Sequence, residues 1–157
     1  MRALLCLDLI NDIVHPDGKL ASKGYVDFAA KHDSLQRIAR IQDQFRQLGC
    51  PVIHFRVGFS KGYPELNEAS PILGGAKEAG ALQLGTWGTD LHADVAAKEG
   101  EPTIAKHRVS PFHRTRLEII LRTQKIDELY ICGVATNIAV ESAARDAHDY
   151  DFNPIIL

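Results

Sequence analysis

The stretch LYICGVATNIAVESAARDA, residues 129–147, decides the fold of this chain. It begins with a short apolar run, Leu129–Cys132, which has the composition of a buried strand. A tight turn follows over Gly133–Asn137, and a helical pattern begins at Ile138. The sequence therefore predicts a strand, a sharp turn and the N-terminus of a helix in immediate succession.

This arrangement is typical of a small-molecule site. The first backbone N–H groups of a helix lack intrahelical partners, so they favour a carboxylate or an oxygen that becomes negative during a reaction. Thr136 or Asn137 can cap the helix. Ala139 lies in the first turn of the helix, where a reactive side chain would be presented, and its methyl group is not reactive.

Length and composition limit the possible classes of protein. The 157 residues predict a single domain over residues 1–157, with 45% hydrophobic and 24% charged residues, as in globular proteins. A net charge of -2 gives no electrostatic reason to expect nucleic acid or an anionic membrane as a partner. No apolar run approaches the ~20 residues that cross a bilayer. Three widely spaced cysteines without a CxxC pair predict reduced thiols and a cytoplasmic location.

The order of elements predicts a three-layer α/β/α fold with a mostly parallel, Rossmann-like sheet. The expected strands are Arg2–Leu9, Pro51–Val57, Glu101–Ala105, Asp127–Cys132 and Asn153–Leu157. The expected helices are Val26–Leu48, Thr115–Thr123 and Ile138–Tyr150. Between the second and third strands, Gly58–Gly100 has no long periodic segment, and we interpret it as an ordered functional loop.

Two charged residues end strands in this scheme. Asp8 ends the first strand and Lys106 ends the third, and Ala139 opens the helix after the fourth. All three should lie at the carboxyl edge of the sheet, where open α/β folds bind ligands. An acid beside a lysine can transfer protons, although an ion pair with a purely structural role would give the same pattern.

Four motifs, in order, resemble those of the isochorismatase-like, or cysteine hydrolase, superfamily. They are ALLCLDLINDIV at residues 3–14, GTWGTDLH at 85–92, TIAKHRVSPF at 103–112 and ICGVATNIAVESAARDA at 131–147. The resemblance covers essentially the whole chain. It implies Asp8 as general acid/base, Lys106 as its electrostatic partner and a nucleophilic cysteine at the position that Ala139 occupies.

The chain thus departs from the family pattern at the nucleophile. Thiol-dependent amide hydrolysis is disfavoured, because a methyl group cannot attack a carbonyl carbon. Cys132 and Cys6 fit core positions, with Cys132 a remote candidate for a substitute nucleophile. Isochorismatases proper hydrolyse a vinyl ether without the thiol, the aspartate protonating the substrate, and this chemistry fits the residues present.

The resemblance also implies a cis peptide between Val134 and Ala135. We expect substrate-binding residues at Val134, Ala135, Asn137, Trp87 and Phe112, with Trp87 equally explained as a core residue.

The sequence predicts no metal and no cofactor. The family's nicotinamidases hold a metal with an aspartate and histidines after the second strand, where this chain has a lone His54. Members are commonly homo-oligomers, so a dimer or tetramer is expected. Relatives usually continue beyond the position of Leu157, which suggests a truncated or partly recorded chain.

Three hypotheses follow. The first is a hydrolase of a small anionic molecule, and the second is a catalytically silent relative that binds a small molecule or partner. The third is a cysteine amidohydrolase whose nucleophile has been replaced by Ala139 through engineering.

Overall fold

Five parallel strands form the central sheet of the computed structural model, which describes residues 1–157. The strands are β1 (Arg2–Leu7), β2 (Val52–Val57), β3 (Thr103–Lys106), β4 (Glu128–Gly133) and β5 (Asn153–Ile156). Their spatial order is β3-β2-β1-β4-β5, so β1 lies at the centre. The nearly continuous apolar sequence of β1 fits this place, because five of its six residues are buried.

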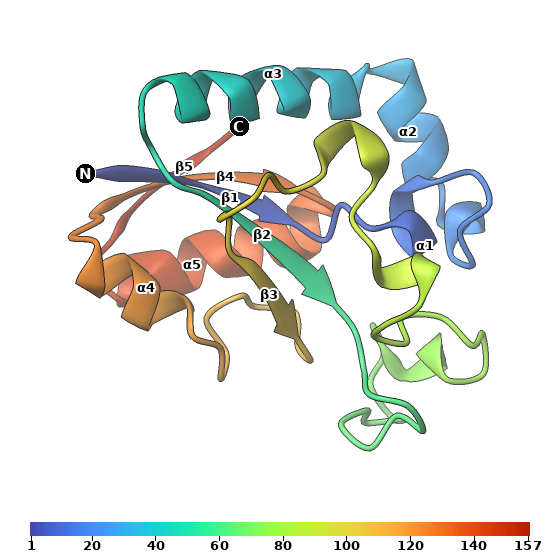
Figure 1. Ribbon diagram of the computed structural model, residues 1–157. Coiled ribbons are helices and arrows are strands. Elements are labelled where there is room, and N and C mark those ends of the chain that lie inside the picture. Colours follow the sequence, from blue (N-terminus) through green and yellow to red (C-terminus); the bar gives the residue numbers. More distant parts are fainter.

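Helices cover both faces of the sheet (Figure 1). On one face lie α1 (Asn11–Val14), α2 (Tyr25–Lys31) and α3 (Ser34–Gln47), and on the other lie α4 (Leu117–Thr123) and α5 (Glu141–Asp149). Each face has its own hydrophobic core, one including Leu4 and Phe45 and the other Phe55 and Leu117. The predicted three-layer α/β/α fold with a parallel sheet is confirmed.

The helix predicted over residues 26–48 is two helices. The chain turns at Asp33, whose φ of 51° lies in the left-handed region that aspartate tolerates better than most residues. The apolar periodicity runs through this break, so the sequence pattern does not reveal it. The longest helix, α3, has 14 residues, and none of the helices combines the length and apolarity of a membrane span.

Other boundaries move by a few residues. β1 ends at Leu7 rather than Leu9, and β3 includes Lys106. Between β1 and α2, residues 10–23 contain α1 and a 3₁₀ turn at Ala21–Lys23. A π-helical turn, Thr136–Val140, precedes α5.

The long segment between β2 and β3 has little regular structure, only three short 3₁₀ turns. Two isolated bridges attach it, Ile10 with Leu91 and Phe59 with Gln83. The Asp12 carboxylate, which is buried, accepts a hydrogen bond from the Leu82 N–H at 2.7 Å. These contacts hold the segment against α1, beside the carboxyl ends of the strands.

Candidate functional site

The Asp8 carboxylate lies immediately after β1, at the carboxyl edge of the sheet. Its backbone has a φ of 56°, and its side chain is only 4% exposed. One carboxylate oxygen accepts a hydrogen bond from the Val57 N–H at 2.8 Å. The other lies 2.7 Å from the Lys106 ammonium. The two residues that the sequence places at strand ends therefore meet, because Lys106 reaches past β2 from the neighbouring β3.

The Lys106 ammonium is fully engaged with the protein. It is 1% exposed and donates to the carbonyl oxygens of Arg108 at 3.1 Å and Val109 at 2.9 Å, in addition to its contact with Asp8. An ammonium has three hydrogens, so these three acceptors use them all. Lys106 is thus placed to act on a ligand through its charge and through Asp8, rather than by a direct hydrogen bond.

Burial raises the pKa of Asp8 above its ordinary value. The Lys106 ammonium and the Val57 N–H oppose this rise, because both stabilise the ionised carboxylate. The carboxyl group of Asp8 is therefore more easily protonated than that of an aspartate in water. A general acid needs this protonated form.

The turn after β4 brings a third element to this edge. Gly133 has a φ of 139°, and a Cβ there would lie 2.2 Å from the Leu7 carbonyl oxygen, so only glycine fits. The expected cis peptide between Val134 and Ala135 is confirmed. The expected capping by Thr136 or Asn137 is wrong, because Ala135 occupies the N-cap position and no side chain caps the turn.

A cavity of about 570 Å³ opens in front of these groups. Of the site residues predicted from sequence, five line it: Asp8, Lys106, Val134, Ala135 and Ala139. Its wall contains no cysteine, serine or threonine side chain, so it offers no hydroxyl or thiol nucleophile of the usual kinds.

Three predicted substrate-binding residues lie away from the cavity. Asn137 is exposed on the π-helical turn. Trp87 is 49% exposed and packs edge-on against His15, so it is neither a lid on the cavity nor a core residue. Phe112 is buried in the core beside α5, where it stacks on Tyr150.

Cys132 is a core residue and faces Cys6 on the neighbouring strand. The two sulfur atoms are 3.8 Å apart, and both side chains are buried on the α3 side of the sheet. Burial and the neighbouring Cys6 raise the pKa of Cys132 well above its ordinary value, so its thiol stays protonated. It does not line the cavity and is not placed to replace a nucleophile at residue 139.

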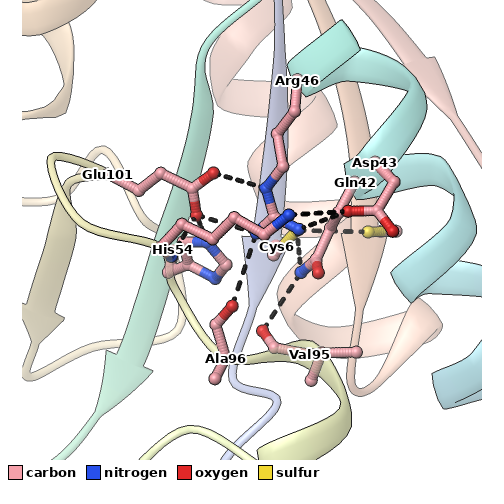
Figure 2. A network of polar contacts seen from close by, with 10 residues as sticks. Cys6, Gln42, Asp43, Arg46, His54, Val95, Ala96 and Glu101 are labelled. Carbon is pink, nitrogen blue, oxygen red and sulfur yellow. Dashed lines mark hydrogen bonds and ion pairs between the residues drawn. The ribbon is translucent and has the colours of Figure 1, made fainter.

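His54 belongs to a buried ionic network rather than to a metal site. Figure 2 shows Glu101 between His54 of β2 and Arg46 of α3. The Glu101 carboxylate lies 2.9 Å from His54 Nε2 and accepts two hydrogen bonds from the Arg46 guanidinium, at 2.6 and 2.9 Å. Burial lowers the pKa of His54, which favours a neutral ring donating from Nε2. The structure contains no cluster of three or more histidine, cysteine, aspartate or glutamate side chains suited to a metal.

Sequence reasoning missed several residues around the cavity. Lys23 lines it from the end of the 3₁₀ turn at Ala21–Lys23, Tyr25 lines it from the start of α2, and residues 71–79 supply much of its apolar wall. Neither segment has a motif or a periodic pattern that marks it. Asp12 was noted only as part of a motif, but its carboxylate organises the neighbouring loops.

Comparisons with known proteins show the family to which the chain belongs. The model of the isochorismatase domain family matches residues 2–157. Over 99% of its length the chain is 29% identical to the ureidoacrylate amidohydrolase RutB of Azorhizobium caulinodans, of which it spans 73%. It is 34% identical to the uncharacterized isochorismatase family protein YecD of Escherichia coli O157:H7, over 78% of this chain and 63% of that protein.

Among solved structures, N-carbamoylsarcosine amidase from Thermoplasma acidophilum is 25% identical, with a TM-score of 0.77 over 99% of this chain and 78% of that one. The matched sequence, the shared fold and the motifs around Asp8 and Lys106 lead to one assignment. The chain belongs to the isochorismatase family.

Proposed function

We propose that the chain is an isochorismatase-like hydrolase that cleaves a vinyl ether in a small anionic substrate. The observation that supports this most directly is the Asp8–Lys106 pair, 2.7 Å apart and buried, on a cavity whose wall carries no cysteine, serine or threonine side chain. This combination provides an acid and leaves the attack to water.

The proton carried by Asp8 starts the reaction. The protonated carboxyl group transfers its proton to the terminal vinyl carbon, and the adjacent ether carbon becomes an oxocarbenium ion. Water adds to that carbon, the resulting hemiketal collapses to a carbonyl compound and an alcohol, and the proton released returns to Asp8. Lys106 holds the carboxylate and stabilises its negative charge after the proton has left.

Because residue 139 is alanine, we propose a reaction that differs from the activities of the named relatives. RutB is an amidohydrolase, and the Thermoplasma protein is an amidase of N-carbamoylsarcosine. Amide hydrolysis through a covalent intermediate needs a nucleophile at the cavity, and residue 139 supplies only a methyl group. The same observation favours the second candidate function, a catalytically silent relative that binds a small molecule.

A substrate panel with matched variants tests the proposal. Purified protein is assayed on vinyl ethers, amides and cyclic imides, and so are Asp8→Asn and Lys106→Met. We expect vinyl-ether hydrolysis that falls by roughly 10²–10⁴-fold in Asp8→Asn, because the proton donor is lost. Asp149→Asn, which changes an exposed carboxylate on α5, is the control and should leave the rate unchanged.

Two outcomes contradict the proposal. An Asp8→Asn variant with the wild-type rate would remove Asp8 from the reaction. Absence of turnover on the whole panel would favour the silent binding protein.

A further inference from the structure

Lys23 is an unpaired cation on the cavity wall. Only three charged residues line the cavity, and two of them, Asp8 and Lys106, neutralise each other. Lys23 is exposed, and it makes no ion pair or side-chain hydrogen bond with the rest of the protein. With Asp8 ionised, the lining therefore carries one net positive charge, and this charge lies at the solvent-exposed end of the cavity.

Tyr25 provides a second polar group on the cavity wall. It lies two residues after Lys23, lines the same cavity and is half-buried. Its hydroxyl makes no hydrogen bond with the protein, so it is free to donate to a ligand. An ammonium and a phenol hydroxyl on one cavity wall can both donate to a carboxylate, which accepts on both oxygens.

The rest of the cavity is suited to an apolar body. Fourteen of its 19 lining residues are hydrophobic, and the loop from residue 71 to residue 79 contributes several of them, including Ile72 and Ala76. At about 570 Å³ the space lies within the range of cavities that bind small organic molecules. A small polar metabolite would leave most of this apolar surface without a partner.

One buried carboxylate holds both sides of this cavity. Asp12 accepts a hydrogen bond from the Lys19 N–H at 3.3 Å, on the segment that leads to Lys23 and Tyr25. Its other oxygen accepts from the Leu82 N–H on the opposite segment. The Lys19 ammonium also donates to the Gly80 carbonyl, so the two segments are tied directly to each other. These hydrogen bonds tie the segment that leads to Lys23 to the segment that carries the apolar wall.

We propose that Lys23 and Tyr25 bind the carboxylate of a monoanionic ligand whose body is largely apolar. This inference rests on the proposed function, because it assumes that the ligand's reacting group reaches Asp8 at the buried end of the same cavity. Lys23 and Tyr25 are then specificity residues, which select the anion at the solvent-exposed end without taking part in proton transfer.

Equilibrium binding of two probes tests this assignment. The probes are 4-phenylbutyrate and its neutral amide, 4-phenylbutanamide, measured by isothermal titration calorimetry on the full chain. Wild-type protein should prefer the carboxylate by roughly three- to tenfold, as expected for an ion pair that solvent partly screens. Lys23→Met should remove this preference by weakening only the carboxylate, since methionine keeps the apolar stem. Raising the salt concentration should reduce the preference in wild type.

Two further variants distinguish the effect of the Lys23 charge from the effect of the apolar cavity wall. Lys31→Met removes an exposed lysine of α2 that does not line the cavity, and it should keep the wild-type preference. Ile72→Ser removes a half-exposed apolar side chain from the wall, and it should weaken both probes by the same factor.

The inference is overturned if Lys23→Met keeps the preference, if wild type shows none, or if neither probe binds up to its solubility limit. These measurements involve no turnover, so their failure leaves the proposed hydrolysis untouched. A fully active Asp8→Asn variant would contradict the proposed hydrolysis and leave the measured carboxylate binding untouched.

Discussion

Replacing Glu101 with glutamine should destabilise the protein in a pH-dependent way. Glu101 joins α3, β2 and the segment before β3, and its side chain is 13% exposed. It accepts two hydrogen bonds from Arg46, one from His54 and one from the Lys98 N–H. Burial opposes ionisation, but these donors outweigh it and lower the pKa of Glu101 from 4.5 to about 2. The ionised carboxylate is therefore worth more to the folded state than to the unfolded chain.

The size of the effect follows from linkage between folding and protonation. A carboxyl group with a pKa of 4.5 in the unfolded chain and about 2 in the folded protein contributes about 3 kcal/mol at neutral pH. Because the folded-state pKa is the lower one, this contribution is complete above about pH 5. It is lost as the pH falls towards 2, where the wild-type carboxylate also becomes protonated.

Urea unfolding at pH 7, 5, 4 and 3 measures this directly. Glu101→Gln should lower the free energy of unfolding by about 3 kcal/mol at pH 7, and the difference from wild type should shrink steadily below pH 4.5. Glu99→Gln is the matched control, because Glu99 is exposed two residues away and makes no ion pair. A loss below about 0.5 kcal/mol, the usual size for an isolated surface change, would refute the reasoning, and so would a difference independent of pH.

Three other changes have defined outcomes. Asp12→Ala leaves the buried Leu82 N–H and the partly buried Lys19 N–H without this acceptor and should lower the free energy of unfolding by roughly 2–4 kcal/mol in urea. Ala139→Cys places a thiol on the cavity and should produce amide hydrolysis that iodoacetamide abolishes; a thiol that is alkylated but brings no activity would count against the site. Gly133→Ala, with its Cβ 2.2 Å from Leu7, should cost roughly 3 kcal/mol or more by circular dichroism melting. Gly62→Ala, which has a positive φ but open space, should cost less.

The sheet was predictable because its signals are local. β1 and β4 are apolar runs ended by Asp8 and Gly133, and the rule that parallel strands share one carboxyl edge brings Asp8 and Lys106 together. The resemblance implied a nucleophile at residue 139, and Ala139 does line the cavity. The sequence did not predict the path of the loops that connect these strands and complete the cavity.

The missed features depend on contacts between distant residues. The helix break at Asp33 leaves the apolar pattern intact, so periodicity alone predicts one continuous helix. Trp87 was expected at the cavity or in the core, yet its ring is half-exposed and packs against His15. The pairing of Glu101 with Arg46 spans 55 positions, and no local pattern connects them.

The segment between β2 and β3 is held near both of its ends and at Leu82, and its residues 71–79 contribute to the cavity wall. Because the entropy of closing a loop rises only slowly with its length, such a segment tolerates insertion or exchange without disturbing the sheet. Transplanting residues 60–80 from a relative should therefore change the apolar wall of the cavity while Asp8, Lys106 and Lys23 stay where they are. The fold in this sense places the acid and the lysine on the sheet and the variable part of the cavity wall on a loop, which natural variation or protein engineering can change separately.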